Sequence, residues 1–224
     1  MGAFFSTLFA LLIKDFRVEF RQRILTATLL LFVGSSCFTL YQVFFAGKAR
    51  VNPLVWNAVF WLIVLFSSFQ AVGRNLVKEM DRQFWYYRFV ASAESLIVSK
   101  LIYHFLLLNI TSFLGWGFLS VFFKNPVQDS LLFFIAIQLG CIGLSAGLTL
   151  VSAIAAKAES NAALLPVLGF PLVIPTLLFV LRISVTAVDG LDWEIALRNI
   201  WTLLGIDSIM IALSILLFPY LWRQ

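Results

Sequence analysis

The sequence predicts an all-α polytopic membrane protein with about six transmembrane helices, an N-terminal amphipathic helix, and a cytoplasmic interfacial helix between spans two and three. Two observations predict this fold class. Of the 224 residues, 62% are hydrophobic and only 12% are charged, whereas about 25% of residues are charged in an ordinary soluble domain. The apolar residues also gather in uncharged runs of about 20 residues, the length that a helix needs to cross a bilayer. We therefore expect one transmembrane domain over residues 1–224.

Residues 1–23 predict an amphipathic helix that lies on the membrane before the first span. Its apolar side chains fall on one helical face and its basic side chains on the other side or at the end. The apolar residues are Phe5, Leu8, Phe9, Leu12, Phe16 and Phe20, and the basic residues are Lys14, Arg17, Arg21 and Arg23.

The first two spans are predicted at about residues 24–45 and 54–72. The first is uncharged and ends before Gly47 and Lys48, and an Asn52-Pro53 turn separates it from the second. Pro fixes its own φ and disfavours helix at the residue before it, so this pair predicts a break between the spans.

The segment 74–98 is too charged to cross the membrane, and its aromatic residues favour the headgroup region. We expect a short cytoplasmic interfacial helix there. Within it, a charged cluster allows two interpretations. It is either a solvated face or the surface that a soluble partner grips to move the attached spans. The candidate partner-coupling residues are Lys78, Glu79, Asp81 and Arg82.

Spans three and four are predicted at about residues 101–123 and 130–153. In span four, Gly140, Gly143 and Gly147 recur at spacings of three and four residues. Small residues at this spacing are typical of closely packed transmembrane helices. A lining of a transport path is the alternative interpretation.

Span five is predicted at about residues 162–181 and contains Pro166, Pro171 and Pro175. Because proline removes a helical hydrogen bond and crowds the preceding turn, we expect a kinked or broken helix. The polar segment 182–198 predicts a loop with at most one short surface helix. Span six follows at about residues 200–221.

The distribution of Lys and Arg predicts the orientation. With six spans, the side that holds both termini carries eleven of these residues and the opposite side carries five. The positive-inside rule therefore puts both termini in the cytoplasm.

Few residues in the spans have the chemistry of a binding site. His104 lies one turn after Lys100, where it either ligates iron or hydrogen-bonds a neighbouring helix. Asp207 lies near mid-span if span six begins directly after Arg198, and otherwise caps a helix at the interface. Cys37 and Cys141 form no redox or haem-attachment motif. No metal site or catalytic group is predicted.

The chain also lacks a Walker motif, because Gly47-Lys48 is its only Gly-Lys pair. We therefore expect no ATPase activity of its own. Any ATP hydrolysis belongs to a partner subunit.

The sequence resembles the haem exporter protein B family, the permease subunit of the cytochrome c maturation system. The resemblance rests on Phe170-Pro171-Leu172-Val173-Ile174-Pro175 in span five, on Ser99-Lys100 leading through His104 into span three, and on the length and order of the spans. It implies a multi-pass protein of the bacterial inner membrane. It also implies three partners: a cytoplasmic ATP-binding-cassette (ABC) ATPase, a companion haem-handling membrane protein and an extracytoplasmic haem chaperone.

By this resemblance, we expect a permease domain that serves haem delivery to the outer face in c-type cytochrome biogenesis. No cofactor is expected to be bound firmly, and haem is a candidate cargo. Two alternatives remain open. One is the permease of another ABC-type exporter, for lipid, drug or polysaccharide. The other is a membrane assembly scaffold that transports nothing.

Overall fold

Seven α-helices make up the computed structural model, which describes residues 2–22, 24–47, 51–157 and 164–223. Within helix α3, the side chains at 73–90 lie outside the description. The helices are α1 (Gly2–Gln22), α2 (Ile24–Ala46), α3 (Pro53–Val90), α4 (Ala93–Phe122), α5 (Ser130–Lys157), α6 (Leu164–Asp189) and α7 (Trp193–Arg223). All regular secondary structure in the described residues is helical.

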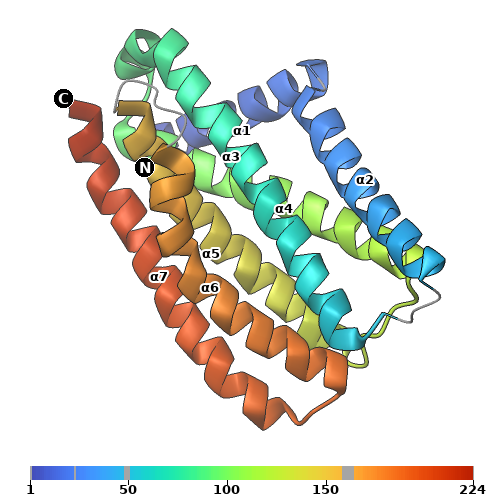
Figure 1. Cartoon of the computed structure of the whole chain (residues 1–224). Helices are drawn as coiled ribbons and strands as arrows, with labels where there is room; N and C mark the ends of the chain where they lie inside the picture. Colours follow the sequence, from blue (N-terminus) through green and yellow to red (C-terminus); the bar gives the residue numbers. More distant parts are fainter. Residues whose placement is uncertain (1, 23, 48–50, 158–163, 224) are drawn as a thin grey trace.

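Six of these helices are long and apolar enough to cross a membrane, which confirms the predicted fold class. The candidate spans are Thr26–Ala46, Pro53–Val72, Ala93–Phe122, Ser130–Ala156, Leu164–Asp189 and Trp193–Leu221. An even number of crossings returns the chain to its starting side, and the two termini lie at the same end of the bundle (Figure 1).

Helix α5 lies at the centre of the bundle and contacts α3, α4, α6 and α7. In its most apolar stretch 72% of the residues are buried inside the protein, against 17% in α2 and in α7. Small residues such as Ala136, Gly140 and Gly143 allow this close contact on several sides, because they let neighbouring backbones approach. Helices α2 and α7 lie at the edges and leave most of their apolar residues partly or fully exposed, as helices facing lipid do.

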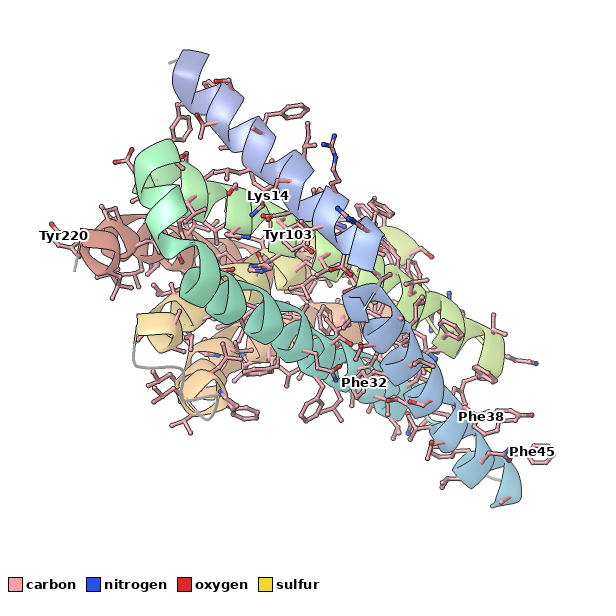
Figure 2. The ribbon with its side chains drawn as sticks, turned by 90° about the horizontal axis from the view of Figure 1, so that it is seen from above. Lys14, Phe32, Phe38, Phe45, Tyr103 and Tyr220 are labelled. Carbon is pink, nitrogen blue, oxygen red and sulfur yellow. The ribbon has the colours of Figure 1, made fainter. Side chains whose placement is uncertain are left out.

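Helix α1 crosses the bundle next to α4 and divides its surface three ways. Leu11 and Asp15 are buried against the bundle, whereas Phe9 and Phe20 are 64% and 76% exposed. Arg17 is exposed on a further side. This three-way division fits a helix in the interface, with one face on protein, one in lipid and one toward water. Figure 2 shows Lys14 of α1 next to Tyr103 of α4, and the exposed Phe38 and Phe45 of α2 pointing outward.

The helix predicted at 74–98 is not a separate element. Helix α3 continues without a break from the second span to Val90, and α4 begins at Ala93. Ser92 caps α4, since its Oγ accepts a hydrogen bond from the backbone N–H of Ser95 at 3.2 Å. Polar residues do not stop a helix, and the break comes only where this cap begins the next one.

The prediction of a loop at 182–198 is wrong. Helix α6 runs on to Asp189 and α7 starts at Trp193, so the connection is only three residues long. Hydropathy did not predict this extension of α6 because some of its polar residues lie inside the bundle. Ser184, for example, is fully buried between apolar neighbours. Gly190 makes the turn with φ of +65°, a conformation that favours glycine.

The prolines of span five lie in one uninterrupted helix. Pro166 falls in the first turn of α6, where a missing N–H costs nothing, and Pro171 and Pro175 lie inside the helix. A helix broken into two pieces is therefore not found, and a bend at these positions stays a prediction.

Candidate functional site

Asp207 lies midway along the apolar helix α7 and not at a helix end, which favours the mid-span interpretation over the interfacial cap. It is 14 residues from each end of the apolar span Trp193–Leu221. Its side chain is buried, with a relative exposure of 2% for the residue. Neither carboxyl oxygen has a hydrogen-bond partner among the residues that the structure describes.

Gly143 of α5 and Thr176 of α6 form the immediate surroundings of Asp207. A Cβ atom placed on Gly143 would overlap Oδ1 of Asp207 and would lie 2.6 Å from Cγ2 and 2.8 Å from Oγ1 of Thr176. The absence of a side chain at position 143 is therefore what lets the carboxyl and the hydroxyl approach α5. Three helices meet at this point, and we call Gly143, Thr176 and Asp207 the mid-membrane polar site.

The other two glycines of span four differ from each other. A Cβ on Gly140 would lie 2.7 Å from Cη2 of Trp61 and 3.2 Å from Cγ2 of Val180. A Cβ on Gly147 would meet only Leu172 and Val173, at 3.7 and 4.0 Å. The missing side chain at Gly140 thus makes room for the indole ring of Trp61, whereas the position of Gly147 has space for a methyl group.

A second buried polar group joins α3 to α6. The side-chain amide of Asn57 and the indole N–H of Trp61 both donate to Oγ of Ser184, each at 2.9 Å. Ser184 in turn donates to the carbonyl of Leu181 at 3.1 Å. Two donors on one hydroxyl fix the distance and the rotation of α3 against α6.

His104 makes a contact between helices. It is fully buried on α4, and its Nδ1 lies 2.8 Å from Oγ1 of Thr149 on α5. This geometry matches the interpretation in which the histidine hydrogen-bonds a neighbouring helix. Among the described residues, no group of three His, Cys, Asp or Glu side chains has the arrangement of a metal site.

A buried ion pair near the start of α4 was not predicted. Nζ of Lys100 lies 3.0 and 2.9 Å from the two carboxylate oxygens of Asp15 on α1. Lys14 adds a second ammonium 2.9 Å from Asp15. The ring of Phe16 packs edge-on against Tyr103 at 5.3 Å between centroids. These contacts attach the interfacial helix to span three.

The four predicted partner-coupling residues Lys78, Glu79, Asp81 and Arg82 lie on the helical extension of α3. Their side chains lie outside the described part of the structure. Residues 158–163, between α5 and α6, likewise lie outside it.

The architecture can be compared with known families. A family model described as CcmB protein matches residues 6–220. The chain belongs to the CcmB family. This is the haem exporter protein B family, so the resemblance noted from span five and from the order of the spans is confirmed. Comparisons with curated proteins and with solved structures found no match.

CcmB proteins are membrane transporter subunits rather than enzymes, and their family connects this chain with haem export in cytochrome c maturation. The six apolar helices agree with a multi-pass CcmB protein. The mid-membrane polar site and the ion pair at Asp15 are features of this chain that the family match does not interpret.

Sequence reasoning found Asp207 and Gly143 but missed their neighbour. Thr176 follows Pro175 in an apolar stretch and looks like an ordinary helix residue. Asp15 was not singled out in the sequence, and Lys100 was noted only as the residue one turn before His104. The sequence did carry a signal that Lys100 is buried, since it stands between the apolar residues 96–98 and 101–103.

Proposed function

We propose that this chain is the permease subunit of an ABC complex that delivers haem to the outer face of the bacterial inner membrane during c-type cytochrome biogenesis. The observation that carries the proposal is the CcmB family match over residues 6–220. In this role haem is the cargo of the complex, and the chain itself binds no cofactor firmly.

The energy source in this proposal is a cytoplasmic ABC ATPase subunit. The absence of a Walker motif from the sequence supports a separate ATPase. The permease then contributes a surface for that subunit and a set of helices that rearrange when the subunit closes.

The helical extension of α3 is the surface that we assign to the ATPase. It continues 18 residues beyond the end of the apolar span at Val72, or about 27 Å at 1.5 Å per residue. Only two residues separate its end at Val90 from the start of α4 at Ala93. A force on the extension is therefore transmitted to spans two and three together. Because α4 packs on α5, and α5 packs on α6 and α7, the whole bundle can respond.

The ion pair of Lys100 with Asp15 extends this connection to α1. An interfacial helix held by a buried pair moves with span three rather than independently of it. We therefore propose that α1, the extension of α3 and the first turns of α4 move as one cytoplasmic unit.

Both termini lie in the cytoplasm in this proposal. Eleven Lys and Arg residues on the side of the termini against five on the other support that orientation. The outer face would then meet a companion haem-handling membrane protein and a haem chaperone, as the family implies.

The proposal is tested by co-expression with a candidate ATPase and purification through a tag on one partner. The double variant Glu79→Gln/Asp81→Asn is expected to reduce recovery of the ATPase at least tenfold. The matched control is Asp189→Asn/Asp192→Asn, which removes two acidic charges on the opposite side and is expected to leave recovery unchanged. No co-purification of the wild type, or equal recovery with both double variants, would contradict the assignment.

A further inference from the structure

Among the side chains that the structure describes, the helices around Asp207 offer it no cation. Helix α7 packs against α4, α5 and α6. Between Ser130 and Ala156, α5 carries no charged residue. Its one titratable group in this stretch, Cys141, faces Ser112 of α4 at 3.4 Å.

The charged and titratable groups of the other two helices are engaged elsewhere or exposed. On α4, Lys100 is paired with Asp15, Tyr103 packs against Phe16 of α1, and His104 contacts Thr149. Glu94 of α4 and Asp189 of α6 are exposed. Arg182 of α6 is also exposed and lies over the ring of Phe179 at 5.6 Å. On α7 itself, Glu194 and Arg198 are exposed near its first turns, and Tyr220 is exposed near its end.

An ionised carboxylate without a cation or a hydrogen-bond donor is strongly disfavoured at the centre of a bilayer. The carboxyl of Asp207 has neither among the described residues. A protonated carboxyl carries no charge and costs much less to bury, and the Thr176 hydroxyl lies near it without a hydrogen bond to it. The gap at Gly143 holds both groups against α5.

We propose that the mid-membrane polar site is a proton-binding site. Its carboxyl carries a proton while α5, α6 and α7 pack as they do here, and it releases that proton to water when the seam between α5 and α7 opens. On opening, the O–H bond of the Asp207 carboxylic acid breaks and the proton passes to a water molecule, leaving a hydrated carboxylate. On closing, the carboxylate takes a proton back from water before it is buried again.

The seam is bordered on its α4 side by an apolar groove of about 220 Å³, which includes Phe105, Ile142 and Ile211 in its lining. Ile211 lies one helical turn from Asp207 on α7, and Ile142 precedes Gly143 on α5. Ser145 is the polar residue in this lining, and its hydroxyl donates to the carbonyl of Ile142 at 2.9 Å rather than to the carboxyl. Release of the proton therefore depends on separation of the helices, which makes the site sensitive to conformation.

The test uses infrared spectroscopy on the full chain in lipid nanodiscs. At neutral pH the wild type is expected to show the carbonyl stretch of a buried carboxylic acid, and Asp207→Asn is expected to lack it. A wild type without this band, or a band that survives in Asp207→Asn, would overturn the proposal. The isolated chain is used, so the result is independent of haem delivery and of any ATPase.

Two glycine variants test the placement of the proton at the seam. Gly143→Ala inserts a methyl group against Asp207 and Thr176, so it is expected to weaken the acid band or shift its frequency. Gly147→Ala is the matched control on the same helix and is expected to leave the band unchanged. Equal spectra for the two variants would contradict the placement.

Transfer to heavy water tests the release step. An acid that gives up its proton when the seam opens exchanges O–H for O–D, which moves the band to a lower frequency. We expect slow exchange in the wild type and at least threefold faster exchange in Gly143→Ala. A band that never exchanges would show a permanently sealed acid and overturn the release step.

Discussion

Nζ of Lys100 on α4 lies within hydrogen-bond distance of both carboxylate oxygens of Asp15 on α1, at 3.0 and 2.9 Å. The two residues are 85 positions apart and both are buried. Burial removes their hydration, and the pair compensates for that loss only while both partners are present. The contact therefore makes the interfacial helix part of the bundle.

Lys100→Met is expected to destabilise the protein by about 3–5 kcal/mol, because it leaves a buried carboxylate without its main partner. The control Arg17→Gln removes an exposed charge on α1 and should change stability by less than about 0.5 kcal/mol. Thermal unfolding in detergent measures both effects. The double variant Lys100→Met/Asp15→Leu should be less destabilised than the sum of its single variants, and strict additivity would argue against the pair.

Ser184→Ala is expected to lower the free energy of unfolding by about 1–3 kcal/mol, because it leaves the donors of Asn57 and Trp61 without their shared acceptor. Ser152→Ala is the control. Ser152 is equally buried, and its hydroxyl donates to the carbonyl of Thr149 within its own helix. Denaturant or thermal unfolding of the two variants should separate them clearly. A cost for Ser152→Ala as large as for Ser184→Ala would contradict the role given to the α3–α6 contact.

Gly140→Ala is expected to destabilise by about 1–3 kcal/mol, since the added methyl overlaps the indole of Trp61 and the helices must move apart. Gly147→Ala should be neutral or slightly stabilising, because its methyl meets neighbours at ordinary contact distance and alanine favours helix. Unfolding of the purified variants and their expression levels test the difference. The reverse order of stability would contradict the packing described for α5.

Reporter fusions test the orientation. A cytoplasmically active reporter joined after Gln224 should be active, and the same reporter inserted at Gly190, in the turn between α6 and α7, should be inactive. Reporter activity only at Gly190 would show that the termini lie outside the cytoplasm, the reverse of the proposed topology.

Much of the fold could be predicted from the sequence because the bilayer imposes it. An uncharged run of suitable length must be helical to satisfy its backbone hydrogen bonds, so the number and order of the spans followed from hydropathy. The positions where the helices end did not follow from hydropathy. Ser184 and the residues around it looked like a polar loop, yet the serine is an acceptor inside the bundle for α3.

Only part of the candidate site could be predicted, because its residues come from different helices. A lone acid such as Asp207 is visible in any apolar run, but its partners come from other helices. Nothing along the chain links Thr176 or Gly143 to position 207, or Asp15 to position 100. Such pairs depend on the way the helices pack, which periodicity does not specify.

The central claim is that this chain serves haem delivery for c-type cytochromes, and the most direct test is to measure those cytochromes in a strain that lacks it. Haem staining of membrane and periplasmic proteins should show their loss, with b-type cytochromes retained, and the wild-type chain should restore them. The Glu79→Gln/Asp81→Asn variant should restore them poorly, although it reaches the membrane at normal levels. Normal c-type cytochromes in the deletion strain would contradict the account and favour a permease for another cargo.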